Sequence, residues 1–214
     1  MKLLVLVHDA EAPSYHRALA ERLAGELEAR GHLVDLSGPR LDRLRLTREE
    51  YDRGRKTGRY PDDVQREHRR LTEAEGLVLV FPLWWMQMPA ELKGWLDRVL
   101  SYGVAYELDG EEPLPRLAPR RAATIVTTGT PDAIYGTDGS HGSLAHAWNE
   151  HVFRFCGFRP VGNVFCGNAV LAGDAERNEH RARVDALASA LTAGTAPETP
   201  VLWPAAASGK SGAR

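Results

Sequence analysis

Residues 77–95 read LVLVFPLWWMQMPAELKGW, and this stretch decides the fold. Residues 77–81 are five consecutive apolar residues, which is typical of a strand buried on both faces, as in a parallel sheet. A loop at 82–88 follows, and Pro89 then opens a helix, because proline suits the first helical position. This helix carries apolar residues at core spacing, namely Leu92, Trp95, Leu96 and Val99. The stretch therefore predicts one strand–loop–helix unit of an α/β sheet.

Outward from this unit, the same alternation runs along the chain. Short apolar runs predict further strands at 2–7, 33–36, 122–128 and 161–166, and helical spacing predicts helices at 14–30, 62–75, 143–155 and 174–193. Strands that alternate with helices imply right-handed crossovers and a doubly wound, five-stranded parallel sheet with helices on both faces. With strand order 2-1-3-4-5, three unusual loops leave from neighbouring strands, at the edge where such sheets bind ligands.

Four stretches carry no such pattern. Residues 37–60 hold eight basic residues against four acidic ones, so they form either a solvated insertion or a docking surface for an anionic cosubstrate. Residues 101–121 predict a long connection, and 129–142 a glycine-rich loop. Residues 194–214 are rich in small residues and proline, so we expect a disordered tail there, after a single domain over 1–193.

Composition excludes several classes of protein. The chain has 214 residues, of which 43% are hydrophobic and 26% charged, so it can build a core. Its formal net charge of −2 gives no reason to expect a nucleic-acid partner or an anionic membrane. No apolar run approaches the ~20 residues of a bilayer span, and no signal peptide is evident, so we expect a cytoplasmic location. The 2 cysteines are expected to be reduced.

The first strand-end loop contains Ser14, Tyr15 and His16 at the expected start of a helix. A hydroxyl at this position is most often an N-cap. A helix N-terminus after the first strand also binds phosphate, through its backbone N–H groups and the helix dipole. Taken alone, these residues favour the cap.

The second loop, at 82–88, contains five large apolar residues, among them the adjacent Trp84 and Trp85. Neighbouring side chains of an extended segment point apart, so both tryptophans cannot face one core. An exposed patch of this size is costly unless something covers it. We interpret the loop as covering a planar aromatic ligand, a dimer partner, or both.

The third loop begins with Thr127, Thr128, Gly129 and Thr130. Glycine and small hydroxyl residues let the backbone approach a ligand closely. The same loop carries Tyr135 and His141, a phenol and an imidazole at the end of a central strand. This pairing favours a binding or catalytic role over that of ordinary surface residues.

Other motifs are excluded. No G-x-G-x-x-G follows the first strand, which argues against a dinucleotide-binding Rossmann site. His146 and His151 are five residues apart, about 140° around an α-helix, so they are not expected to form a zinc pair. Cys156 has no Cys or His at zinc spacing, and we expect no metal site.

Several stretches of the sequence resemble the motifs of a known protein family. FPLWW at 81–85 and MPAELKGW at 88–95 resemble the central signature of the NAD(P)H:quinone oxidoreductases, the DT-diaphorase-like branch of the flavodoxin fold. TTG at 127–129 and FCGF at 155–158, with Tyr135 and His141 between them, resemble the next block of the same family. The resemblance covers about residues 2–190 and implies a flavodoxin-like sheet.

The resemblance implies a bound flavin, which is FAD or in some relatives FMN. It also implies a homodimer with the active site at the interface, and ping-pong transfer of hydride from NAD(P)H to a quinone. By position, the residues that would hold the flavin phosphates are His8, Ser14, Tyr15 and His16. Those that would border the flavin ring are Pro82, Leu83, Trp84, Trp85, Met86, Thr127, Thr128, Gly129, Thr130 and Tyr135.

The resemblance also assigns the reacting residues. Tyr135 and His141 match the family's hydride-transfer pair, and Tyr106 matches an aromatic residue that the partner subunit places in the substrate pocket, near Trp85 and His141. At other pocket positions the chain departs from the family. The departing residues are His16 for Asn, Trp84 for Gln, Met86 for Phe, Gln87 for Gly and Leu108 for Tyr. The resemblance therefore does not fix which quinone is used.

Two alternatives stay open. One is a regulatory flavoprotein subunit of a potassium-efflux-type membrane system, which would have a membrane partner. The other is a dedicated reductase of one specialised metabolite. The length of the 37–60 insertion favours the enzyme over the regulatory subunit.

Overall fold

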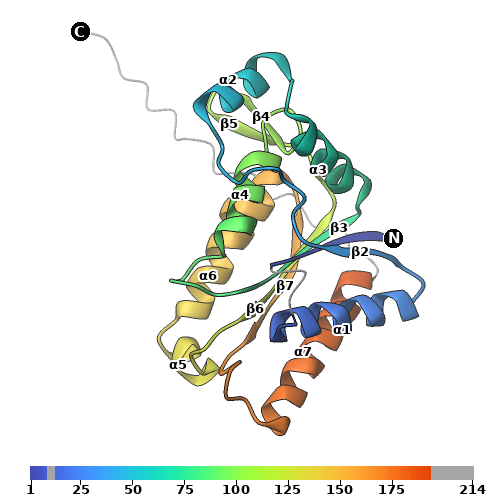
Figure 1. Ribbon diagram of the computed structural model, residues 1–214, viewed down its shortest axis with the longest axis vertical. Coiled ribbons are helices and arrows are strands. Elements are labelled where there is room, and N and C mark those ends of the chain that lie inside the picture. The colour runs from blue at the N-terminus through green and yellow to red at the C-terminus, as the bar shows by residue number, and fades with distance from the viewer. Residues whose placement is uncertain (9–12, 194–214) are drawn as a thin grey trace.

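A five-stranded parallel sheet forms the centre of the computed structural model, which describes residues 1–8 and 13–193 (Figure 1). The strands are β1 (Lys2–Val7), β2 (Leu33–Ser37), β3 (Gly76–Pro82), β6 (Arg121–Thr127) and β7 (Arg159–Cys166). Their order is β2-β1-β3-β6-β7, and every neighbouring pair is parallel. The expected order 2-1-3-4-5 and the doubly wound α/β fold are confirmed.

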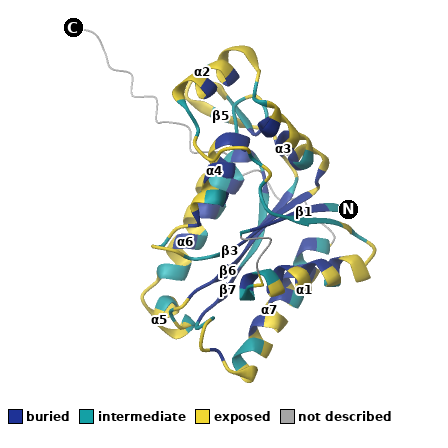
Figure 2. Ribbon diagram, viewed as in Figure 1, coloured by how far each residue is buried: buried dark blue, intermediate teal, exposed yellow. Residues whose placement is uncertain are grey.

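Helices cover both faces of the sheet (Figures 1 and 2). On one face lie α1 (Tyr15–Ala29) and α7 (Asp174–Thr192), and on the other α3 (Asp62–Glu73), α4 (Ala90–Val99) and α6 (Ser140–Trp148). The alternation of side chains along a strand divides the core between these layers. Leu3, Val5 and Val7 pack toward α1 and α7, whereas Leu4 and Leu6 pack toward the other layer.

Helix α1 follows its sequence signals. The Ser14 side chain accepts a hydrogen bond from the Arg17 N–H, which makes it the predicted N-cap. Gly31 has a φ of +80°, the left-handed conformation that lets the chain leave the helix. Pro61 and Pro89 are the N-caps of α3 and α4. Helix α3 begins at residue 62, as predicted, whereas Pro89 stands one position before the first helical position expected for it.

The 37–60 insertion contains a helix that was not predicted, α2 (Arg48–Thr57). Its buried residues are Glu50 and Gly54, so it has no apolar stripe to detect. The Thr47 hydroxyl accepts a hydrogen bond from the Glu50 N–H, and Gly58 ends the helix with a φ of 66°. These two capping residues are the sequence features from which helix α2 could have been predicted.

The 101–121 connection is also more ordered than expected. It contains an antiparallel hairpin, β4 (Tyr106–Asp109) and β5 (Glu112–Pro115), which turns at Gly110 with a φ of 64°. The 129–142 loop contains a short helix, α5 (Asp132–Thr137), and α6 begins inside it at Ser140. Asp109 pairs with Glu112, so Gly110 and Glu111 form the two-residue turn of this hairpin, and the glycine was the sequence feature that could have predicted it.

The helix expected at 143–155 changes type within its length. Helix α6 ends at Trp148, and a π-helix, η1 (Asn149–Arg154), continues it. Residues five apart share a face in a π-helix, because its hydrogen bonds run from i to i+5. The rings of His146 and His151 accordingly meet at 5.5 Å, so the expectation that they point apart was wrong.

Cys156 and Cys166 are both free and buried. Burial raises the pKa of each thiol to about 12, so neither is a reactive thiolate near neutral pH. Within 1–8 and 13–193, no helix is long and apolar enough to span a membrane. The tail expected at 194–214 lies outside the described residues.

Candidate functional site

Three loops leave the sheet from adjacent strands at its carboxyl edge. Strands β1, β3 and β6 are neighbours, and Pro82 at the end of β3 pairs with Thr127 at the end of β6. Backbone hydrogen bonds continue past the strands, from the His8 N–H to Val80 O and from the Leu83 N–H to Thr127 O. The starting points of the 8–16, 82–88 and 127–141 loops therefore lie together.

The first loop gathers two histidines around the start of α1. His16 Nε2 lies 3.0 Å from His8 O and 3.1 Å from Ser14 Oγ, and His16 is buried. The His8 ring stacks on that of His16 at 5.9 Å, and its Nδ1 lies 3.0 Å from Glu91 Oε2. Three of the four residues expected at the phosphates are thus adjacent.

Tyr15, the fourth of these residues, directs its side chain elsewhere. Its hydroxyl lies 2.9 Å from His180 Nδ1 on α7, and the guanidinium of Arg177 lies 4.6 Å from the centre of its ring. Burial raises the pKa of the Tyr15 phenol. Tyr15 is therefore positioned to contribute its backbone N–H at the helix start, while its side chain joins α1 to α7.

The second loop is a tight turn that exposes two tryptophans. Trp84 and Gln87 exchange backbone hydrogen bonds of 2.9 Å in both directions. Between them, Trp85 and Met86 have φ values of 52° and 60°, the left-handed pair that defines a type I′ turn. Trp85 is 97% exposed and Trp84 54% exposed, so neither belongs to the core.

The turn lies against the first loop, because the Trp84 ring meets the His8 ring at 5.0 Å. Other residues of the turn are more buried. Leu83 and Met86 pack partly against the core. The two tryptophan rings are consequently the apolar surface that this loop presents outward.

The third loop is bonded largely within the protein. The Thr128 N–H donates to Cys166 O at 3.0 Å, and the Thr128 hydroxyl donates to Thr130 O at 2.6 Å. Thr127 and Thr128 are buried. Gly129 has open space where a Cβ would stand, so the backbone there is accessible. Of the four small residues, Gly129 and Thr130 are the ones that reach the surface.

Tyr135 and His141 lie together, as the sequence led us to expect. Their rings meet edge to face at 5.8 Å, and the His141 ring stacks on Phe165 of β7 at 4.0 Å with an interplanar angle of 11°. Burial lowers the pKa of His141, although Asp132 and Asp138 act in the opposite direction. The neutral imidazole is therefore favoured near pH 7.

Three polar residues around His141 were missed at the sequence level. Asp132 Oδ1 lies 3.8 Å from His141 Nε2, and Asp132 Oδ2 lies 4.0 Å from His180 Nε2. Arg183 Nη1 donates to Asp132 Oδ2 at 2.5 Å. These residues come from α5 and α7, about fifty positions apart in sequence, so no local motif connects them.

Tyr106 lies at the other end of the molecule. It stands on β4, where its ring meets Phe155 at 5.0 Å, beside a cavity of about 270 Å³ that is also lined by Tyr51, Tyr60 and Tyr102. In Figure 1, β4 lies near the top with α2, whereas α5 lies near the bottom. Within one chain, the structure does not bring Tyr106 together with Tyr135 and His141.

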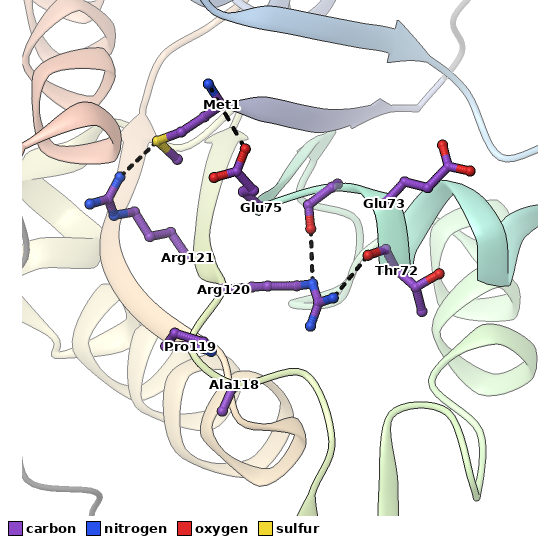
Figure 3. A pocket seen from close by; sticks show the side chains of 9 residues that line it. Met1, Thr72, Glu73, Glu75, Ala118, Pro119, Arg120 and Arg121 are labelled. Atoms are coloured by element: carbon purple, nitrogen blue, oxygen red, sulfur yellow. Dashed lines mark hydrogen bonds and ion pairs between the residues drawn. The ribbon is translucent and has the colours of Figure 1, made fainter.

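Another cavity, of about 370 Å³, lies at the amino ends of the strands (Figure 3). Arg120 and Arg121 line it, but their guanidinium groups are already bonded to backbone carbonyls. Arg120 donates to Ala74 O and Thr72 O, and Arg121 donates to Leu191 O and Ala193 O. These arginines close off the base of the sheet, so this cavity is a poor candidate for an anionic ligand.

Comparison with known proteins identifies the family. A model of the flavodoxin-like fold family matches residues 1–188. An NAD(P)H oxidoreductase of Haemophilus influenzae, itself uncharacterized, is 33% identical over 178 residues, 82% of this chain and 87% of that protein. NAD(P)H dehydrogenase (quinone) 1 of Rattus norvegicus is 30% identical over 178 residues, 73% of this chain and 65% of that longer protein.

A solved structure agrees with these matches. The NAD(P)H:quinone oxidoreductase from Methanothermobacter marburgensis superposes with a TM-score of 0.79 and 27% identity, over 90% of this chain and 98% of that one. The sequence matches and the structural match thus indicate the same family. The chain belongs to the NAD(P)H:quinone oxidoreductase family of enzymes, which have the flavodoxin-like fold.

Proposed function

We propose that the protein is a flavin-dependent NAD(P)H:quinone oxidoreductase, which transfers two electrons as hydride from NAD(P)H to a quinone-like acceptor in a ping-pong cycle. The observation that supports this proposal is that three loops begin at one sheet edge, on the neighbouring strands β1, β3 and β6. These loops lead to the start of α1, the exposed tryptophan turn, and the Tyr135–His141 pair. Family membership supplies the reaction class.

The residues at this edge fit a flavin, FAD in the first instance. The N-terminus of α1, a 15-residue helix, favours the negative charge of a diphosphate, and Ser14 and His16 stand beside it. Trp84 and Trp85 offer flat apolar surface to a planar ring. Two non-glycine residues held at positive φ cost on the order of 1 kcal/mol or more each, and such strain is typical of ligand sites.

When bound, a flavin supplies the ring that accepts hydride from NAD(P)H and passes two electrons to the acceptor. The chain's own contribution is electrostatic and acid–base. The Tyr135 hydroxyl is a hydrogen-bond donor for developing negative charge, and one well-placed donor stabilises such charge by about 3 kcal/mol. Neutral His141 can accept or return a proton near pH 7.

We further propose a homodimer whose active sites lie at the interface. Two observations support it. Tyr106 stands on β4 and Tyr135 on α5, and these two elements lie near opposite ends of the molecule in Figure 1, so Tyr106 can serve that site only from a second copy. Trp85, at 97% exposure, is apolar surface of the kind that a subunit interface covers.

The test is the identity of the cofactor together with turnover. The purified protein should be yellow, and the flavin released on denaturation should have the mass of FAD, with FMN as the alternative. NADH or NADPH should then reduce a soluble quinone at a rate proportional to bound flavin. A colourless protein that binds neither FAD nor FMN on titration would contradict the proposal. A yellow protein that no nicotinamide reduces would instead favour a regulatory role.

A further inference from the structure

Asp132 lies between two histidines, His141 and the buried His180, and contributes to the environment of both. Its Oδ1 is 3.8 Å from His141 Nε2, and its Oδ2 is 4.0 Å from His180 Nε2. Asp132 Oδ1 and the two Nε2 atoms are buried, and none has a hydrogen-bond partner among the described residues. Three polar atoms of this kind in one place call for an explanation, because an unpaired buried polar group is costly.

Two contacts hold the Asp132 carboxylate in this position. Arg183 donates to its Oδ2 at 2.5 Å, and the same Arg183 nitrogen donates to Phe165 O at 2.8 Å. On the other side lies Gly167, where an added Cβ would stand 2.6 Å from Asp132 Oδ1. The carboxylate therefore needs both the arginine and the absence of a side chain at 167.

The contacts of His180 select one tautomer. Its Nδ1 lies 2.9 Å from the Tyr15 hydroxyl, which can donate to a bare ring nitrogen. The proton then resides on Nε2, the atom that faces Asp132. The other tautomer would turn a nitrogen lone pair toward a carboxylate, which is electrostatically unfavourable.

The electrostatic part of this reasoning applies to His141, whose Nε2 faces Asp132 Oδ1 at 3.8 Å. We propose that Asp132 is a positioning residue for His141, which holds the neutral imidazole as its Nε2–H tautomer and leaves Nδ1 as the nitrogen that accepts a proton. The importance of this tautomer for catalysis rests on the proposed function. The tautomer itself rests only on the contacts of this chain.

Other charged and titratable groups face His141 less directly. From α5 comes Tyr135, the exposed carboxylate of Asp138 follows it, and from α7 come His180 and Arg183. Strand β7 contributes Phe165, which has no charge. Asp132 is thus the carboxylate that is placed against His141 Nε2. Among residues 1–8 and 13–193, no group of three His, Cys, Asp or Glu is arranged to hold a metal ion, so a shared metal does not explain the cluster.

Asp132→Asn gives a sharp test, because Arg183 controls which way the new amide turns. A guanidinium has only donors, so the oxygen of the introduced amide should remain at the Arg183 side and its nitrogen should replace Oδ1. That nitrogen is a donor toward His141 Nε2. The neutral ring should therefore switch from the Nε2–H to the Nδ1–H tautomer, the kind of change that disables a catalytic histidine.

The measurement is ¹⁵N NMR of histidine-labelled protein, with the His141 signals assigned by their loss in His141→Gln. Wild-type His141 and His180 should both show a protonated Nε2. In Asp132→Asn, His141 should change to the Nδ1–H tautomer, and His180 should keep the Nε2–H tautomer. The matched control is Asp138→Asn, which also removes a carboxylate near His141 but should leave the tautomer unchanged. Wild-type His141 protonated on Nδ1, or an unchanged tautomer in folded Asp132→Asn, would overturn the inference. The spectrum of the wild-type protein tests the predicted Nε2–H tautomer of His141 even if the Asp132→Asn variant does not fold.

A kinetic measurement separates this inference from the proposed function. Reduction of bound flavin by NAD(P)H should slow roughly 10- to 100-fold in Asp132→Asn, at unchanged flavin content. A switched tautomer with an unchanged rate would support the positioning role and count against His141 in the reaction. A slower rate with an unswitched tautomer would overturn the positioning role and leave the proposed function standing.

Discussion

Tyr135 and His141 are held differently by the protein, although they meet each other. His141 is stacked on Phe165 at 4.0 Å and faces Asp132, so its ring has little freedom. Tyr135 stands on α5, a helix of six residues, and is only partly buried. The imidazole is therefore the fixed member of the pair, and the phenol has more freedom to adjust to a bound ring.

Tyr135→Phe and His141→Gln should each slow reduction of bound flavin by NAD(P)H without releasing the flavin. Each loss removes about 1–3 kcal/mol of transition-state stabilisation, roughly 5- to 150-fold in rate. Because the residues act as a unit, the double variant should fall short of the product of the single effects. Stopped-flow absorbance at the flavin band gives the rate. Wild-type rates in both single variants would remove the pair from the mechanism.

His68 predicts how stability depends on pH. Burial lowers its pKa from 6.5 to about 4, and its Nε2 lies 3.0 Å from Ser101 Oγ. Between these pH values the unfolded chain binds a proton at His68 that the folded chain does not. The free energy of unfolding should therefore fall as the pH drops from 6.5 toward 4, by up to about 3 kcal/mol from this group.

His68→Gln should remove that part of the acid sensitivity. Urea unfolding at about pH 7 and about pH 4.5, on either side of most of this titration, measures it as the difference between the two free energies of unfolding. The variant should lose less stability on acidification than the wild type does. Burial also lowers the pKa of His141 and His180, and their contribution remains in both proteins. An equal loss in wild type and variant would show that folded His68 is already protonated.

At the scale of elements, a buried ion network attaches α2 to the rest of the fold. Arg98 of α4 is 1% exposed, donates to Glu50 Oε1 at 2.8 Å and to Asp63 Oδ2 at 2.6 Å, and also donates to Arg43 O at 2.6 Å. It therefore links α2, α3 and the 38–47 segment. Burial alone would raise the pKa of Asp63, but hydrogen bonds from Arg98 and the Asp42 N–H lower it.

Arg98→Met should destabilise the protein by about 3–5 kcal/mol, because it leaves the buried Asp63 carboxylate without its cation and leaves buried Glu50 paired only with the more exposed Arg43. Loss of far-ultraviolet circular dichroism in denaturant gives the free energy. The control is Arg48→Met, which removes an exposed pair with Asp52 and should change stability by less than about 0.5 kcal/mol. Equal effects of the two substitutions would contradict a structural role for the buried network.

The sequence was informative about elements whose stability comes from apolar burial. All five sheet strands and the helices α1, α3, α4 and α7 were predicted, because each shows an apolar run or stripe. Helix α2 was missed because it buries Glu50 and Gly54 through an ion network and a close ring contact with Tyr60. The π-helix was missed because a change of helical period leaves no compositional trace.

The candidate site was predictable to a similar extent. The placement of residues near a strand end, such as His8 and Trp85, follows from topology, because a parallel sheet brings its carboxyl ends to one edge. The direction of the Tyr15 side chain did not follow, since it depends on His180, which is 165 residues away. Asp132 was missed for the same reason: its partners lie on α7, and pairing at that distance is a property of the folded chain.

At the scale of the whole molecule, the proposed homodimer gives a mass and a test of shared sites. Light scattering should give twice the 23.6 kDa of the chain at micromolar concentration, from an interface that buries more than about 1,200 Å². A monomer would leave no role in the active site for Tyr106, because β4, which carries it, lies near the opposite end of the molecule from α5.

Subunit mixing then tests whether Tyr106 acts across the interface. His141→Gln and Tyr106→Leu homodimers should both turn over quinone slowly. If Tyr106 serves the partner's site, a mixed dimer contains one site with both native residues, so mixing should restore up to half of the wild-type activity per mixed dimer. If both residues serve the same chain, every site keeps one defect and mixing restores nothing.

The type I′ turn also allows ligand binding to be followed by tryptophan fluorescence. Among the described tryptophans, Trp95 and Trp148 are buried, whereas Trp85 stands almost fully in solvent and Trp84 is half exposed. Iodide in solution should therefore quench the emission of the turn selectively. A flat molecule laid over the turn would shield it from iodide, so ligand docking, subunit association and their order in time can be followed in the unlabelled wild-type protein.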